Sequence, residues 1–291
     1  MSAADGTVLG LTKIADAGPP ASSWNLVLVA DGYTAAQLDR FRSDADEVRD
    51  RLFREPPFDR SEIRQAINVF RLDVASREQG ADKPKCSDGA GTGASAATYF
   101  DSTFCSDGKT ERLLYGDAAL AIATVSRALP QWHQIIVLVN DQERGGAGGS
   151  VAWFSNGGSD WREVAIHELG HSAFGLADEY DYGGPDRYQG AEPAEPNVTL
   201  MSDPTSVKWG TFVDAPARSP TRANPSCSQS DPGPSGVPAS AIGTFEGAKY
   251  SHCAVYRPAW ECMMRTTSAP FCRVCIDRIV TVMSRFGTGP G

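Results

Sequence analysis

Residues 164–180 read VAIHELGHSAFGLADEY, and this stretch carries the strongest indications of the chain's fold and chemistry. It overlaps a segment, Trp161 to about Phe174, that we expect to be a helix capped by Asp160. His167 and His171 are four residues apart, so on a helix both imidazoles project from one face. Two imidazoles in that arrangement can bind one zinc ion.

Glu168 follows His167 directly and is expected beside the metal rather than on it. A carboxylate there can take a proton from a water molecule and later pass it to a leaving amine. Histidines four residues apart also occur on helices by chance, without any metal. Two of the four histidines of the chain fall in this one motif, which favours a catalytic zinc site with Glu168 as the general base and acid.

A catalytic zinc needs a third protein ligand. Gly175 can take the left-handed conformation that ends a helix, and a residue just past it can turn back toward the metal. The spacing from Gly175 to Asp178 is similar to the glycine-to-ligand spacing of the metzincin pattern HExxHxxGxxH, although Gly175 stands one residue further from His171. We therefore expect Asp178 as the third ligand, with Glu179 as the alternative.

Other interpretations of these carboxylates stay open. Asp178 and Glu179 would also suit a solvated acidic turn, or a shell that orients the histidines. Glu192 or Glu195 would suit a thermolysin-like arrangement, which needs a second helix. That segment reads AEPAEP over residues 191–196, and its prolines oppose a helix.

Hydrophobic patterning predicts alternating strands and helices in the first part of the chain. We expect strands at residues 24–30, 68–75, 134–140 and 150–155, and helices at 35–53, 111–129, 161–174 and 271–286. The glycines of residues 145–149 lack the Lys-Ser or Lys-Thr of a phosphate loop and are expected to form a flexible connection. Beyond residue 182 many Pro, Gly, Ser and Asp residues predict irregular structure, with one packed segment at 207–213.

Composition limits the classes of partner. The 291 residues include 27 Lys and Arg against 36 Asp and Glu, a formal net charge of −9, so a nucleic-acid partner is not expected. No apolar run reaches the roughly 18–20 residues of a membrane span. No signal peptide is visible, yet the seven cysteines suit either disulfides in an oxidising compartment or thiolates on a metal.

The chain resembles the metallopeptidase family named for bacterial immunoglobulin A proteases. The stretch HELGHSAFGLADEY carries the resemblance most specifically. Other matching segments follow in order along residues 24–286: VADGYT at 29–34, NVF at 68–70, VN at 139–140, PNVT at 196–199, VKW at 207–209, FEGA at 245–248, YRP at 256–258, CMM at 262–264 and FCRVC at 271–275. The resemblance implies a zinc endopeptidase of metzincin-like build, but no particular protein substrate.

A metzincin-like build has further implications for individual residues. It implies a Met turn beneath the zinc, for which Met264 is the candidate and Met201 the alternative. It also implies that the strand at 150–154 is the edge to which a peptide substrate adds. Three residues near the Met turn are candidate oxyanion or substrate contacts, although a packed aromatic or a surface arginine is the simpler interpretation: Tyr250, Tyr256 and Arg257.

The cysteines admit two readings. Cys262, Cys272 and Cys275, with Cys253 or Cys227, would make a structural zinc site, as a similar pattern does in the archaemetzincins. The alternative, which we favour because these proteases usually act outside the cell, is disulfides such as Cys227–Cys253 and Cys262–Cys272. Residues 80–97 are rich in Gly, Ser, Ala and Asp and are expected to form a loop, and the spacing of Cys86 and Cys105 suggests a further disulfide that would tether it.

The sequence thus predicts an α/β, metzincin-like zincin fold with a mixed sheet and an active-site helix. Residues 1–182 are expected to form an α/β subdomain and residues 183–291 a loop-rich subdomain, together one catalytic domain. We expect a secreted, monomeric zinc endopeptidase that acts on protein or peptide, with one catalytic zinc and room for a second, structural one. The competing hypothesis is a zinc-containing module that binds protein or glycan without cleaving it.

Overall fold

The computed structural model describes residues 5–214, 218–233 and 237–286. The chain divides into two compact units. The first unit comprises the residues up to Ala173 together with those from Met283 onward, and the second unit is Phe174–Val282. The units therefore part just after the HELGH segment, whereas the change of composition that we noted in the sequence comes later, after Tyr182.

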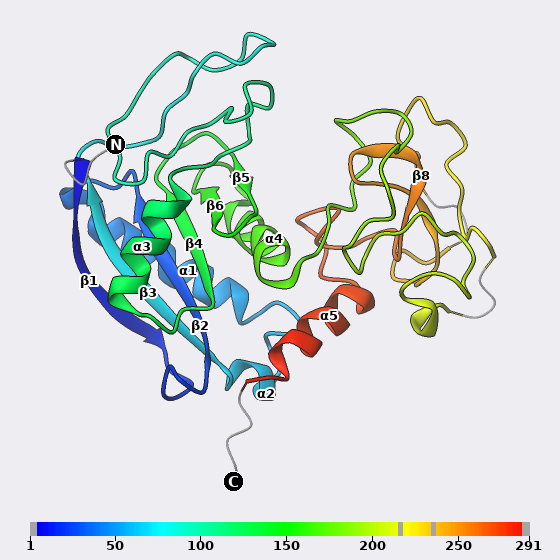
Figure 1. The fold of residues 1–291 in the computed structure, drawn as a ribbon, viewed down its shortest axis with the longest axis horizontal. Helices are drawn as coiled ribbons and strands as arrows, with labels where there is room; N and C mark the ends of the chain where they lie inside the picture. The colour runs from blue at the N-terminus through cyan, green and yellow to red at the C-terminus, as the bar shows by residue number, and fades with distance from the viewer. Residues whose placement is uncertain (1–4, 215–217, 234–236, 287–291) are drawn as a thin grey trace. The chain divides into compact units, whose positions relative to one another are not determined.

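The first unit contains a mixed six-stranded sheet in the order β1-β3-β2-β4-β6-β5 (Figure 1). Its strands are β1 (Gly6–Ala15), β2 (Trp24–Asp31), β3 (Ile67–Ser76), β4 (Gln134–Val139), β5 (Gly146–Ala147) and β6 (Ala152–Ser155). β3, β2, β4 and β6 run parallel, while β1 and β5 pair antiparallel at the two edges. The expected α/β class with a mixed sheet is confirmed.

Helices connect the parallel strands. α1 (Leu38–Leu52) follows β2, and α3 (Ala118–Ala128) precedes β4; a single turn, α2 (Ser61–Arg64), leads into β3. β3 and β4 lie on opposite sides of β2, so right-handed crossovers place α1 and α3 on opposite faces of the sheet. Every residue of β2 and β4 is buried, which explains why these strands read as continuous apolar runs.

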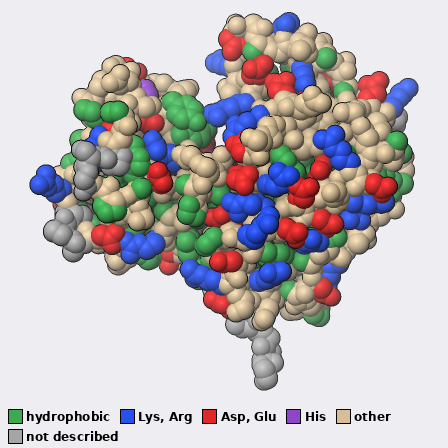
Figure 2. All heavy atoms as spheres, turned by 180° about the vertical axis from the view of Figure 1, so that it is seen from behind, with side chains coloured by type: hydrophobic (Ala, Val, Ile, Leu, Met, Phe, Trp, Pro, Cys, Tyr) green, Lys and Arg blue, Asp and Glu red, His purple; other side chains and the backbone are tan. Residues whose placement is uncertain are grey.

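The outer side of α1 is charged. Its arginines pair with acids one turn away, for example Arg42 with Asp39 and Arg49 with Asp46. Figure 2 shows acidic and basic side chains interspersed on the face that it draws. Such mixed pairs favour solubility rather than binding to one class of charged partner.

A buried carboxylate organises the end of β2. Asp31 has no exposed surface and accepts hydrogen bonds from the hydroxyls of Ser76, at 3.0 Å, and Ser102, at 2.5 Å, and from the amide of Phe100, at 3.1 Å. Burial raises the pKa of Asp31, although these donors oppose the shift. One side chain thereby fixes the loop around residues 98–102 to the sheet.

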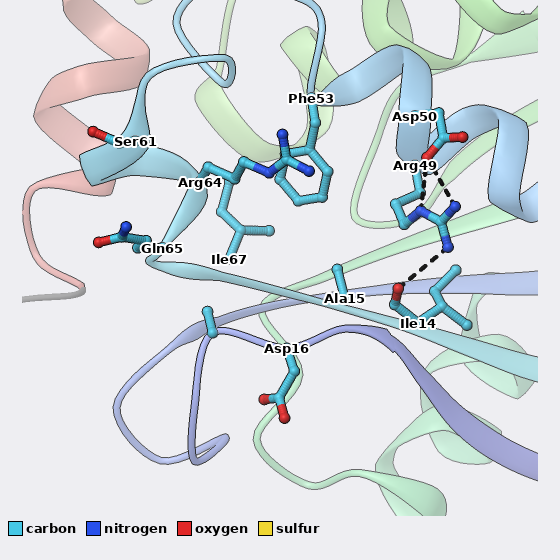
Figure 3. Close-up of a pocket in the computed structure, with 11 residues that line it drawn as sticks. Ile14, Ala15, Asp16, Arg49, Asp50, Phe53, Ser61, Arg64, Gln65 and Ile67 are labelled. Atoms are coloured by element: carbon cyan, nitrogen blue, oxygen red, sulfur yellow. Dashed lines mark hydrogen bonds and ion pairs between the residues drawn. The ribbon is translucent and has the colours of Figure 1, made fainter.

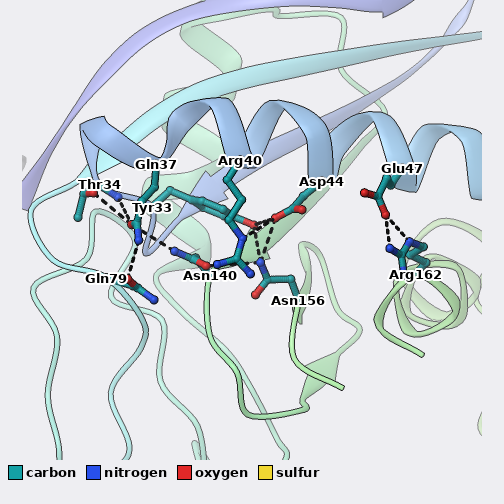
Figure 4. Close-up of polar contacts among 10 residues, drawn as sticks. All are labelled: Tyr33, Thr34, Gln37, Arg40, Asp44, Glu47, Gln79, Asn140, Asn156 and Arg162. Atoms are coloured by element: carbon teal, nitrogen blue, oxygen red, sulfur yellow. Dashed lines mark hydrogen bonds and ion pairs between the residues drawn. The ribbon is translucent and has the colours of Figure 1, made fainter. Parts of the chain in front are cut away.

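A second polar cluster ties α1 to the carboxyl ends of the parallel strands (Figure 4). The Tyr33 hydroxyl, just past β2, donates to Asp44 of α1 at 2.7 Å. Asn156, just past β6, donates to both of them, at 3.1 and 3.0 Å. Because Tyr33 is fully buried and faces a carboxylate, its pKa lies well above the usual value, so its hydroxyl keeps its proton and donates.

Three details of the first unit differ from expectation. The helix expected at 111–129 begins only at Ala118, because the Asp117 side chain caps it by accepting from the Leu120 amide at 2.8 Å. β1 was missed, since its mostly exposed residues show no clear alternation. The expected edge strand at 150–155 is β6, an inner strand, and the edge is formed by β5.

The second unit is largely irregular. It contains a 3-10 turn, η3 (Gly210–Phe212), a hairpin of β7 (Phe245–Ala248) and β8 (Ser251–Arg257), and the helix α5 (Arg273–Met283). Ala177, Val198, Ala248 and Val255 form a small buried core. The expected packed segment at 207–213 is anchored by Trp209, whose indole donates to the Gly243 carbonyl at 2.8 Å.

Within the described residues we find no helix that is long and apolar enough to cross a membrane.

The role of Asp31 can be tested by unfolding. Asp31→Ala leaves several buried donors without an acceptor and should lower the free energy of unfolding by roughly 2–4 kcal/mol. Asp39→Ala removes a carboxylate that is 93% exposed and should change it by less than about 0.5 kcal/mol. Urea titrations of both variants measure the difference, and equal midpoints would contradict the assigned role.

Candidate metal centre

The histidine pair lies on α4 (Trp161–Phe174), whose limits match the expected helix. The Nε2 atoms of His167 and His171 are 3.1 Å apart, and the two rings stand at 88° to each other. Two ligands on one tetrahedral zinc, each at 2.0–2.1 Å, are roughly 3.3 Å apart. The two nitrogens are therefore already close to the separation that a shared metal requires.

The glycine-rich stretch packs against the same face of α4. A Cβ at Gly146 would lie 2.7 Å from the Glu168 carboxylate, and one at Gly148 would lie 2.4 Å from the Cβ of His171. Real Cβ atoms essentially never come so close, so glycine is required at Gly148 for His171 to keep its place. A Cβ at Gly146 would displace the carboxylate end of the Glu168 side chain. We expected a flexible connection in this stretch. Instead its residues Gly146 and Ala147 form the edge strand β5, and the stretch lies against Glu168 and His171.

Tyr115 supports this arrangement and was missed in the sequence. Its hydroxyl donates to the Gly148 carbonyl at 2.6 Å, which holds the stretch beside His171. Burial raises the pKa of Tyr115, and the negative charge of Glu168 raises it further, so the hydroxyl stays protonated. Tyr115 lies in an irregular segment before α3, where no sequence pattern distinguishes it.

Asp178 belongs to the second unit, four residues past the end of α4. Gly175 has a φ of +63°, as expected for the residue that ends a helix, and Arg278 donates to the last helical carbonyl, that of Phe174, at 2.8 Å. The Asp178 carboxylate is buried and accepts a 2.5 Å hydrogen bond from the Tyr250 hydroxyl. Tyr250 therefore orients Asp178.

Tyr250 reaches Asp178 from an unusual turn. Lys249 and Tyr250 form the two-residue connection between β7 and β8, and both have positive φ, 45° and 67°. Such turns favour Asn-Gly or Asp-Gly, so this hairpin could not be predicted from residue preferences. Two side chains held in the left-handed region cost free energy, and strain of this kind is common where a residue must be positioned for function.

The alternative third ligand, Glu179, points to a different environment. It is fully buried, and its carboxylate accepts from the Asn197 amide at 2.8 Å and from the Cys275 thiol at 3.4 Å. The thermolysin-like alternatives form ion pairs elsewhere. Glu192 pairs with Lys208 at 3.0 Å and Glu195 with Lys249 at 2.6 Å.

The exposure of the remaining candidates shows which of them suit a Met turn or a contact with substrate. Met264 is fully buried, and its carbonyl accepts from the Glu179 amide at 2.7 Å, whereas Met201 is 50% exposed, which does not suit a packed Met turn. Arg257 is fully buried and donates to the carbonyls of Glu246 and Gly247, so its guanidinium is not presented to a substrate. Tyr256 is half-buried in β8, and burial and the charge of Glu246 raise its pKa.

The cysteines fall into two classes. Cys86 pairs with Cys105 in the first unit, and Cys227 pairs with Cys253 in the second, as two of the expected disulfides. The third expected disulfide, Cys262–Cys272, is wrong, because Cys262, Cys272 and Cys275 are free and buried. The zinc site of four cysteines is wrong as well, since Cys227 and Cys253 are bonded to each other.

A surface hollow in the first unit lies between the end of β1, α1 and α2 (Figure 3). Arg49, Arg64 and Phe53 line it, and the Arg64 guanidinium lies over the Phe53 ring at 4.7 Å. The hollow contains no histidine or cysteine. Its lining therefore supplies no imidazole or thiolate ligand for a metal.

Comparison with known proteins agrees with the site. A sequence model of the family described as IgA Peptidase M64 matches residues 12–227 and 235–283, which is most of the chain. The chain belongs to the M64 peptidase family. M64 peptidases are metallopeptidases, so membership indicates a protease that acts on protein or peptide, and it accounts for a histidine pair suited to a metal. No curated protein matches the chain.

Close packing between the glycine stretch and α4 gives a direct prediction. Gly148→Ala should push His171 out of place and lower the free energy of unfolding by about 1–3 kcal/mol. Gly149→Ala is the matched control, because its Cβ would meet nothing nearer than 3.5 Å. Urea unfolding and the imidazole NMR signals of His171 report the two effects. Unchanged His171 signals in Gly148→Ala would contradict the packing.

Proposed function

We propose that this chain is a zinc-dependent endopeptidase in which His167, His171 and Asp178 hold the metal and Glu168 moves the proton. The observation that carries the proposal is the 3.1 Å approach of the two imidazole nitrogens on the helix that also carries Glu168. Membership of the M64 peptidase family supports the same reaction class.

The donor chemistry of these residues fits zinc. Two imidazole nitrogens and one carboxylate oxygen are the ligand types of catalytic zinc sites, which keep a fourth position open. Zinc bound there would polarise the scissile carbonyl and lower the pKa of the attacking water.

Glu168 performs the proton transfers. Its carboxylate accepts a proton from the attacking water and then donates it to the nitrogen of the departing amine. Only 7% of Glu168 is exposed, and the Gly146 backbone lies against it, so the side chain has little room to turn away. A fixed carboxylate in a sparsely hydrated position exchanges protons with the substrate rather than with bulk water.

The edge strand β5 is the surface that we propose for the peptide substrate. It is the last strand at its side of the sheet, but Leu113 bridges Gly146, whose amide donates to the Arg112 carbonyl at 3.1 Å. A peptide would therefore have to displace residues 112–113 at Gly146. An extended peptide can add to such an edge through main-chain hydrogen bonds, which hold the scissile bond without reading much sequence. Gly146 also contacts Glu168, so a peptide on β5 would pass close to the general base.

Two residues of the second unit complete the proposal. Tyr250 is a positioning residue, because it holds the Asp178 carboxylate through a 2.5 Å hydrogen bond. Met264 is the proposed Met-turn residue, since it is buried and its backbone binds the residue next to Asp178. The two disulfides support an extracellular site of action, where an oxidising environment preserves them.

Replacing the proposed general base, Glu168, distinguishes the peptidase hypothesis from that of a non-catalytic binding module. Glu168→Gln should keep its zinc, while kcat/KM on denatured casein falls by about 10²–10⁴-fold. Glu163→Gln on the same helix is the control, because Glu163 pairs with Arg51 at 3.0 Å and takes no part in the reaction. Full activity in Glu168→Gln would end the mechanism. A wild type that binds zinc but cleaves nothing would favour the non-catalytic module.

The tyrosine contact predicts an effect on metal affinity. Tyr250→Phe removes one hydrogen bond to Asp178 and should weaken zinc binding about 10–100-fold, measured by competition with a chromophoric chelator. Tyr256→Phe is the control, since its hydroxyl interacts with Ser202 instead. Equal zinc affinity in the two variants would remove Tyr250 from the site.

A further inference from the structure

Three free cysteines and a glutamate converge in the second unit. The sulfur atoms of Cys262, Cys272 and Cys275 and a carboxylate oxygen of Glu179 all lie within 4.8 Å of one another. All four residues are buried. The peptidase mechanism uses none of them, and together they supply four donors to one point.

The separations between these donors match a tetrahedral metal site. Cys262 Sγ and Cys275 Sγ are 3.6 Å apart, and Cys275 Sγ is 3.4 Å from Glu179 Oε1. Two thiolates at 2.3 Å from one zinc stand about 3.8 Å apart, and a thiolate and a carboxylate oxygen about 3.5 Å. Both observed distances lie close to these values.

We propose that Cys262, Cys272, Cys275 and Glu179 bind a second zinc ion, which is structural and closed to substrate. Three thiolates select a soft or borderline metal, and four protein donors leave no open position. Glu179 takes the fourth place that the sequence suggested for Cys227 or Cys253. This site is separate from the peptidase proposal, and neither requires the other.

An unpartnered oxygen of the Glu179 carboxylate is a second observation that favours a cation here. Glu179 Oε2 is buried and has no hydrogen-bond partner, while Oε1 is held by Asn197 at 2.8 Å. Buried polar atoms are seldom left without a partner, and a metal ion would satisfy this one.

A zinc ion here would join three segments of the second unit. Cys262 lies two residues before Met264, Cys272 and Cys275 flank the start of α5, and Glu179 directly follows Asp178. The second unit is largely irregular, with one hairpin and one helix, so a metal that joins these segments would contribute strongly to its stability.

The test is metal analysis of the full chain, purified without chelators. Zinc measured by inductively coupled plasma mass spectrometry should give two ions per chain. The His167→Ala/His171→Ala double variant should keep one ion, and Cys275→Ser should lose one. After exchange with cobalt, the double variant should retain the thiolate-to-cobalt charge-transfer band, which Cys275→Ser lacks. One zinc per chain in the wild type, lost with the histidines, would overturn the proposal.

A measurement on the wild type alone covers the case in which Cys275→Ser does not fold. The three thiols should resist Ellman's reagent in the zinc-loaded protein and react once a chelator removes the metal. Three thiols that react at the same rate before and after chelation would overturn the proposal, as would a Cys262–Cys275 disulfide in freshly purified protein. One zinc per chain with a thiolate band on cobalt exchange would support this site and contradict the catalytic one.

Discussion

The Nε2 atoms of His167 and His171 lie 3.1 Å apart, and the proposed metal site depends on this approach. The helix places both rings on one face, and the backbone of the glycine stretch packs against His171 and keeps it in place. Gly148 lies against the Cβ of His171 and Gly146 against Glu168, and Tyr115 holds this stretch by its carbonyl. The edge of the sheet thus packs directly against Glu168 and His171 of α4, and larger side chains at those glycines would push the two elements apart.

Local patterns predicted the elements that are regular. β2, β4, α1 and α4 have continuous apolar runs or helical spacing, and their observed limits agree with the sequence to within a few residues. The histidine pair and Glu168 could also be predicted to lie together, because all three lie within one and a half turns of the same helix. Gly175 has the left-handed conformation that its position suggested.

Features that depend on distant residues could not be predicted. The fourth donor beside the three free cysteines is Glu179, which lies 83 residues before Cys262 and carries no cysteine-like signal. Tyr250 binds Asp178 from a turn whose Lys-Tyr sequence is atypical, and the inner place of β6 follows from the two-residue strand β5. In each case tertiary packing decides the position, and single-residue preferences are too weak to show it.

The most direct measurement is an anomalous difference map at the zinc absorption edge, from crystals of protein purified without added metal. We expect a peak about 2.0–2.1 Å from the Nε2 atoms of both His167 and His171, with Asp178 as the third protein ligand. A fully ordered histidine pair with no peak beside it, while the same protein cleaves peptides, would contradict the central claim.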